Sequence, residues 1–173
     1  MIVRRWPSAL GLLAAGSAIA TGANRESVAI TLGVALLCYL GAAALNRPWI
    51  AWAAILGGSI VVTIGELAGI VWWGALGITA AALVTIGLIG KAPRPALTAQ
   101  TAALLGFGGP AVIALFLNPR VGMVLAGLAL ASHAAWDVVH WRRNEVVPRS
   151  LAEFCLWLDV PLGLALIVLA LTG

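Results

Sequence analysis

The chain has 173 residues, of which 62% are hydrophobic and only 9% are charged. A soluble domain normally carries about 25% charged residues, so this composition excludes a water-facing globular surface and favours a protein embedded in a lipid bilayer. The formal net charge is +4, but the basic residues are spread through short loops, which argues against a nucleic-acid-binding patch. No polar stretch is long enough for a separate soluble domain, so we expect one domain over residues 1–173.

The apolar residues form seven segments in succession, and we interpret each as a helix. Backbone polar groups in lipid must be paired within the protein, which restricts the fold to helices or a closed barrel, and the period-2 alternation of barrel strands is missing here. The fold class is therefore all-α, a polytopic membrane bundle of seven transmembrane helices. The first segment also has features of a secretory signal peptide, but we interpret it as a retained helix. The predicted segments cover about residues 8–21, 28–45, 49–66, 68–90, 97–117, 121–141 and 151–171.

The count of seven helices depends on the division between the third and fourth segments. Residues 49–90 hold Glu66 as their single charge, and this run is too long for one span of ~20 residues. The glycines near Glu66 favour a turn at residues 65–69.

The distribution of basic residues supports this count. With seven helices and the N-terminus inside, eight basic residues face the inner side and two, Arg25 and Arg120, face the outer side. Merging the third and fourth segments would change this ratio to six against four, so the positive-inside rule favours the seven-helix arrangement. We expect an inside N-terminus, an outside C-terminus and a bacterial-type cytoplasmic membrane. The eight predicted inner residues are Arg4, Arg5, Arg47, Lys91, Arg94, Arg142, Arg143 and Arg149.

Reactive side chains gather in the last two predicted helices. His133, Asp137 and His140 have i, i+4, i+7 spacing, which places them on one helix face. Cys155 and Asp159 share a face of the next helix, and the short connection makes the two helices antiparallel neighbours. At ~1.5 Å per residue, Asp137 and Cys155 lie about 7 Å deep, while His133 and Asp159 lie about 13 Å deep. The matched depths allow one site to take groups from both helices.

Buried charge in this cluster needs compensation, because a charged residue in a bilayer costs about 2.5–3.5 kcal/mol. Imidazole, carboxylate and thiolate are ligands for zinc, iron or copper. We therefore predict a divalent metal site formed by His133, Asp137, His140, Cys155 and Asp159. The alternative is a pair of buried hydrogen bonds, His133–Asp159 and His140–Asp137, that only fix helix packing. The spacing matches no strict metal-binding signature.

Three functional hypotheses follow. The first is a membrane-embedded metalloenzyme, a hydrolase or an oxidoreductase, that acts on a membrane lipid or another hydrophobic small molecule. In this hypothesis Arg142 and Arg143 hold an anionic head group, and Trp136 and Trp157 line the pocket. The second is a metal-ion or proton transporter or channel that uses the same groups. The third is a structural membrane protein with buried polar pairs, and an oligomer is compatible with the sequence.

Three further features predict local structure. The Gly-Phe-Gly-Gly-Pro sequence at residues 106–110 predicts a disrupted fifth helix, either a packed kink or an unwound segment. Pro161 predicts a kink beside the cluster. Glu153 is expected to pair with Arg149 or Arg143.

Overall fold

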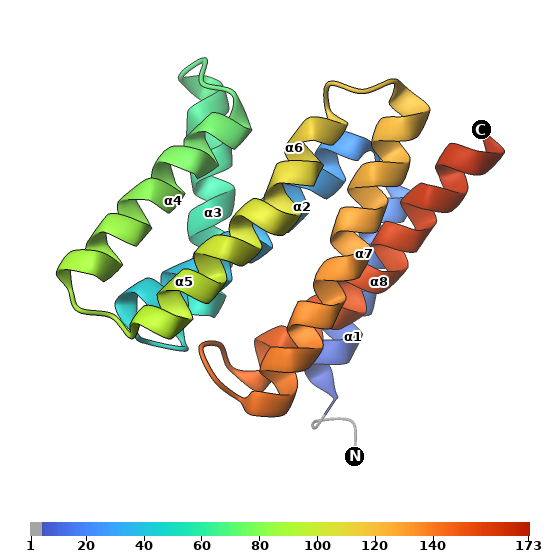
Figure 1. Ribbon diagram of the computed structural model, residues 1–173. Helices are drawn as coiled ribbons and strands as arrows, with labels where there is room; N and C mark the ends of the chain where they lie inside the picture. Colours follow the sequence, from blue (N-terminus) through green and yellow to red (C-terminus); the bar gives the residue numbers. More distant parts are fainter. Residues whose placement is uncertain (1–4) are drawn as a thin grey trace.

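The protein is a bundle of helices in the computed structural model, which describes residues 5–173 (Figure 1). The regular elements are α1 (Trp6–Ala20), α2 (Arg25–Leu45), α3 (Ile50–Leu67), α4 (Trp72–Ile89), α5 (Arg94–Ala103), the π-helix η2 (Leu104–Gly108), α6 (Gly109–Ala114), α7 (Pro119–Arg143) and α8 (Arg149–Thr172). Because α5, η2 and α6 form one continuous helical run, Arg94–Ala114, the described residues contain seven helical segments. They coincide with the seven apolar segments that the sequence predicts.

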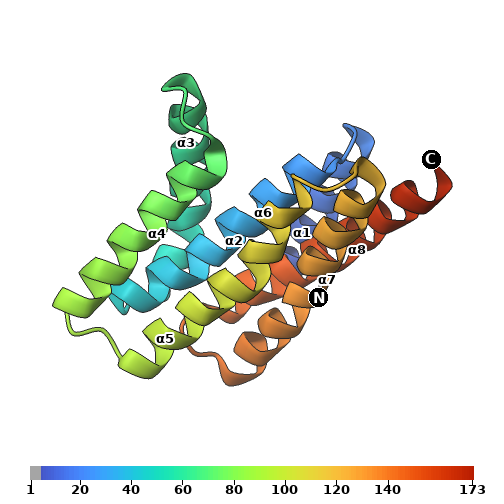
Figure 2. The same ribbon diagram turned by 45° about the horizontal axis from the view of Figure 1, so that its top comes forward.

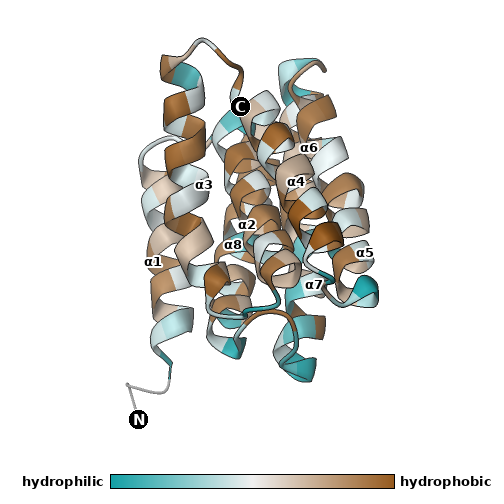
Figure 3. Cartoon of the chain, turned by 90° about the vertical axis from the view of Figure 1, so that its left-hand side faces the viewer, coloured by the Kyte–Doolittle hydropathy of each residue, from teal (hydrophilic) through white to brown (hydrophobic). Residues whose placement is uncertain are grey.

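Six of these segments are long and apolar enough to cross a membrane. This property indicates an integral, multi-pass membrane protein, and Figure 3 shows apolar residues along the helices with polar residues gathered mainly at their ends. The remaining helix, α1, has 15 residues, which is fewer than the ~20 that a span normally needs. Its crossing of the bilayer, like the predicted orientation of the bundle, remains a prediction. The six candidate spans are α2, α3, α4, α5–η2–α6, α7 and α8.

Asparagine and glycine residues set several helix boundaries. The side chain of Asn24 accepts hydrogen bonds from two backbone N–H groups of α2 and completes a capping box. Asn46 and Asn144 end α2 and α7 in the left-handed conformation, which asparagine tolerates better than most residues. Gly69 has φ 71° in the turn after α3, so a turn between the third and fourth segments is confirmed, although it begins at Ala68 and leaves Gly65 and Glu66 within α3.

Helix α2 is the centre of the bundle, and 78% of the residues in its most apolar 18-residue stretch are buried. It packs against α3, α4, α7 and the α5–η2–α6 run. The α3–α4 pair leans away from the remaining helices, as Figures 1 and 2 show.

The most extensive contact between two helices joins α7 and α8, and the two run antiparallel as predicted. Gly127 and Gly163 lie at their crossing, where a Cβ on either glycine would lie 2.6 Å from the carbonyl oxygen of the other. Small residues therefore allow the two backbones that carry the reactive cluster to approach closely.

The disrupted segment at residues 106–110 takes a different form from an unwound helix. Residues Leu104–Gly108 form a π-helix, and the helical run continues directly into α6, which contains Pro110. Proline has no N–H to offer the carbonyl four residues earlier, and the wider π turn accommodates this loss. The predicted kink at Pro161 is likewise milder than a break, because α8 continues as one helix on both sides.

One end of the bundle is basic. The start of α1 and the α2–α3, α4–α5 and α7–α8 connections lie together at the lower end of Figure 1, which we call the basic end. In the described chain, Arg25 and Arg120 are the two basic residues of the opposite end, and Arg4 lies outside the described residues. The basic end carries Arg5, Arg47, Lys91, Arg94, Arg142, Arg143 and Arg149.

Candidate metal centre

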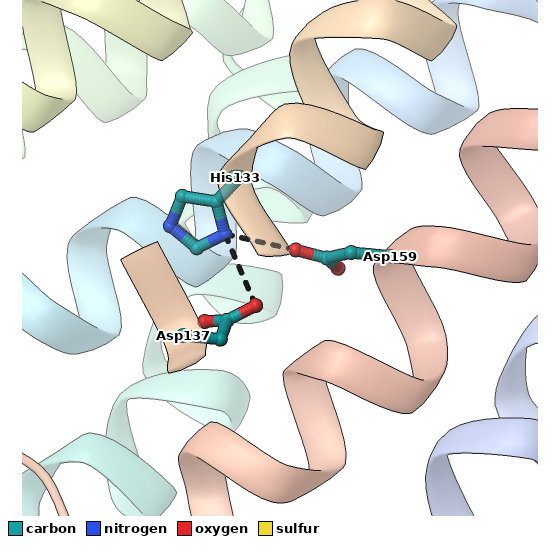
Figure 4. A group of neighbouring side chains, drawn as sticks. All are labelled: His133, Asp137 and Asp159. Carbon is teal, nitrogen blue, oxygen red and sulfur yellow. Dashed lines mark hydrogen bonds and ion pairs between the residues drawn. The ribbon is translucent and has the colours of Figure 1, made fainter. Parts of the chain in front are cut away.

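Three of the predicted ligand residues meet where α7 crosses α8. The Nδ1 atom of His133 lies 2.8 Å from Asp159 Oδ2 and 3.6 Å from Asp137 Oδ2. One ligand atom from each residue lies within 4.8 Å of the others. Figure 4 shows both carboxyl groups directed toward the same ring nitrogen. We call His133, Asp137 and Asp159 the triad.

The triad is closed to solvent and only partly satisfied by hydrogen bonds. All three side chains have 0% exposure. The Nδ1–H of His133 donates to Asp159, and the hydroxyl of Tyr39 donates to Asp137 Oδ1 at 2.6 Å. Three buried atoms have no hydrogen-bond partner in the described chain: His133 Nε2, Asp137 Oδ2 and Asp159 Oδ1. Unpaired buried polar atoms are costly and require an explanation.

The distances from His133 Nδ1 to the two carboxylates are close to those around a shared cation. Two ligand atoms of a tetrahedral zinc site, each about 2.0–2.1 Å from the metal, lie about 3.3 Å apart. The observed separations of 2.8 and 3.6 Å from His133 Nδ1 bracket this value. Loss of the Nδ1 proton and a small shift of the side chains would therefore let a cation lie between Nδ1 and the two carboxylates, and would give Asp137 Oδ2 a partner.

His140 belongs to a neighbouring network instead of the triad. Its Nδ1–H donates to the Trp136 carbonyl at 2.9 Å, and its Nε2 accepts from the Gln100 amide at 3.0 Å. The indole N–H of Trp136 donates to Gln100 Oε1 at 3.0 Å. The alternative His140–Asp137 hydrogen bond does not form, because Asp137 bonds to Tyr39.

Cys155 also lies outside the triad. It is buried, as is the other cysteine, Cys38, and both are free thiols. The two line an apolar cavity of about 200 Å³ between α2, α3 and α8. Among the described residues, the potential metal ligands grouped with His133 are two carboxylates, and neither cysteine sulfur is among them.

The four residues expected to bind substrate separate into two pairs. Arg143 and Trp136 line a cavity between α5 and α7. Arg142 is exposed at the end of α7, and Trp157 is 43% exposed on α8. The arrangement therefore brings only the first pair to a common cavity.

Glu153 does not pair as the sequence predicted. It accepts a hydrogen bond from Ser8 and lies 3.7 Å from Arg5. Arg149 instead donates to the backbone carbonyl of Trp141 at the end of α7. The reason is packing: α1 lies along α8 and presents its own polar groups to Glu153.

Two aromatic residues complete the surroundings of the triad, and neither is among the site residues that the sequence predicts. Tyr39 packs edge-on against His133 and His140, with ring centroids 5.6 and 4.8 Å away. Phe107, held by the π-helix, packs edge-on against His133 at 5.3 Å. Tyr39 is the single tyrosine of the chain and lies inside an apolar run. This unusual position was the one sequence feature that could have pointed to it as a site residue. π-Helical turns frequently occur at functional sites.

The chain matches no protein-family model, no curated protein and no solved structure.

Proposed function

We propose that the chain is a membrane-embedded metalloprotein in which His133, Asp137 and Asp159 hold a divalent cation. The observation that carries this proposal is the convergence of two fully buried carboxyl groups on Nδ1 of a fully buried histidine, where Asp137 Oδ2 has no hydrogen-bond partner. Each residue of the triad has 0% exposure, and each has one polar atom without a partner. Tyr39 supports the site from outside by donating to Asp137, as partners of metal ligands commonly do.

Charge balance favours a cation over hydrogen bonds alone. When both aspartates are ionised as metal ligands, they carry two negative charges beside a neutral histidine, in a region closed to solvent. A divalent cation reduces this net charge to zero, and it does so at the point where both carboxylates are directed. Buried charges in proteins are generally paired or coordinate metals.

The ligand types narrow the metal and the chemistry. One imidazole and two carboxylates without sulfur suit zinc or non-haem iron better than copper in a thiolate site. A protein site with three ligands leaves further coordination positions open, so a bound cation could polarise a substrate oxygen or activate water or dioxygen. We infer an enzyme, a hydrolase or an oxidoreductase, that acts on a lipid or another hydrophobic small molecule.

A transporter is a weaker candidate because the polar groups occupy one part of the bundle. The buried polar residues of the described chain are Gln100, His133, Asp137, His140 and Asp159. From His133 to the start of α7, a further ~20 Å of helix, no buried polar side chain follows in the described chain. A relay across the bilayer would need such groups.

Elemental analysis of the purified protein tests the proposal. The protein is produced with added zinc, iron or copper and purified in detergent without chelator. We expect about one metal ion per chain in the native protein and a loss of metal in His133→Asn and Asp159→Asn. His140→Asn is the matched control, because it alters a buried histidine of the same helix outside the triad. A folded native chain without metal, or a similar loss of metal in the control, contradicts the proposal.

A further inference from the structure

A cavity with both polar and apolar lining residues lies between α5 and α7 at the basic end. Its volume is about 460 Å³, within the range of small-molecule sites. The cavity exists because η2 and α6 pack on α7, whereas α5 diverges from it toward the basic end (Figure 1). Its lining includes Ala96, Ala99 and Val139, which form an apolar wall, and Arg143 and Glu145, which lie at the rim.

The deepest part of the cavity is a closed hydrogen-bond ring. Trp136 donates to Gln100, Gln100 donates to His140, and His140 donates to the carbonyl of Trp136. Gln100 and His140 are 2% and 5% exposed. Both nitrogens of His140 are hydrogen-bonded within this ring. The charged side chains of the cavity, Arg143 and Glu145, therefore lie at its rim.

Arg143 gives the rim its preference for anions. No described carboxylate forms an ion pair with Arg143. Glu145 is the one carboxylate in the lining, but the surrounding end of the bundle is strongly basic. An arginine with free donors binds phosphate and carboxylate oxygens in a bidentate manner.

We propose that this cavity binds an amphiphilic anion, with a phosphate head group on Arg143 and an acyl chain along Ala96, Ala99 and Val139. The inference rests on the proposed function and deepens it, because it names the class of molecule on which the enzyme would act. Tyr39 is the connection between the two sites. Its ring packs on His140 at the floor of the cavity, and its hydroxyl donates to Asp137 of the triad.

Binding of a single-chain phospholipid to the detergent-purified protein tests this proposal. The probe is lysophosphatidylglycerol, which is compared with zwitterionic lysophosphatidylcholine and with glycerol 3-phosphate as the head group alone. We expect saturable binding of the first probe, with affinity at least about tenfold above that of the other two. Arg143→Gln should lower this affinity about tenfold. Arg142→Gln, which removes the same charge from the adjacent residue, should change it less than about twofold.

A second variant tests the cavity without changing charge. Ala99→Leu fills the apolar wall and should weaken lysophosphatidylglycerol binding while leaving glycerol 3-phosphate unaffected. Equal binding of the two lysolipids, or equal effects of Arg142→Gln and Arg143→Gln, would overturn the proposal in favour of a general surface charge effect. Metal content is measured on the same samples. Metal retention without lipid binding refutes this inference alone, whereas lipid binding without metal refutes the proposed function alone.

Discussion

The Gly127–Gly163 crossing permits a direct test of how helix packing forms the triad. In Gly163→Ala, the new Cβ would lie 2.6 Å from the Gly127 carbonyl oxygen and 2.9 Å from the Ala131 backbone nitrogen. Both neighbours are backbone atoms and cannot rotate away. The helices must separate by about 0.8 Å to restore an ordinary contact, and overpacking of this kind typically costs about 1–3 kcal/mol.

The separation should propagate to the metal centre. Asp159 lies one helical turn from Gly163, on the same face of α8, and its hydrogen bond to His133 is 2.8 Å long. An increase of about 0.8 Å would exceed the usual hydrogen-bond range of roughly 2.7–3.2 Å. We therefore expect Gly163→Ala to lower the free energy of unfolding by about 1–3 kcal/mol and metal affinity by about 10-fold or more.

Unfolding in a denaturing detergent and competition with a chelator measure the two effects. Gly57→Ala is the matched control, because a Cβ at this α3 glycine would meet no atom within 4 Å. The control should unfold like the native protein, or slightly later, and keep its metal. If Gly163→Ala behaves as the control does in both assays, the close crossing of α7 and α8 does not position the triad.

Three further predictions concern the groups around the triad. Tyr39→Phe removes the hydrogen bond to Asp137 and should lower the free energy of unfolding by about 1–3 kcal/mol and metal affinity about tenfold; chelator competition and detergent unfolding measure both, and native values in the two assays contradict the role of Tyr39. Metal binding should release protons and weaken as pH falls, because protons compete for the imidazole and the carboxylates; calorimetry in buffers of different ionisation enthalpy detects the release, and a heat independent of buffer refutes it. Gly11→Ala places a Cβ against the backbone carbonyl of Phe154 and should loosen α1 from α8, as measured by proteolysis, while metal content stays native; loss of metal would show that α1 docking and the triad are coupled.

The apolar pattern predicts the helical segments well because an apolar segment in lipid has no water to pair its backbone polar groups. Each long charge-free run must satisfy its backbone internally in lipid, so the segments agree closely with the observed helices. The turn at Gly69 was also predictable, since glycine and a carboxylate mark the one interruption of a long run. Spacing on α7 and matched depth on α8 were sufficient to pair His133 with Asp159.

The spacing of residues shows which side chains share a helix face. It does not show which neighbouring helix that face meets, because the rotation of each helix about its axis is set by tertiary packing. His140 has nearly the same angular position as His133, but Gln100 of α5 and the carbonyl of Trp136 occupy its nitrogens. Tyr39 approaches from α2, a helix far away in the sequence, and takes the place on Asp137 that a second histidine was expected to hold. Contacts between distant helices are not encoded in the periodicity of either helix.

The metal claim is tested most directly by the coordination shell of a bound ion. X-ray absorption spectroscopy of the zinc-loaded native protein should show nitrogen and oxygen ligands at about 2.0–2.2 Å and no sulfur, with an unchanged spectrum in Cys155→Ser. In Asp159→Asn the ion should be lost or its shell altered. Sulfur at about 2.3 Å, or a native spectrum in Asp159→Asn, would contradict a centre built from His133, Asp137 and Asp159.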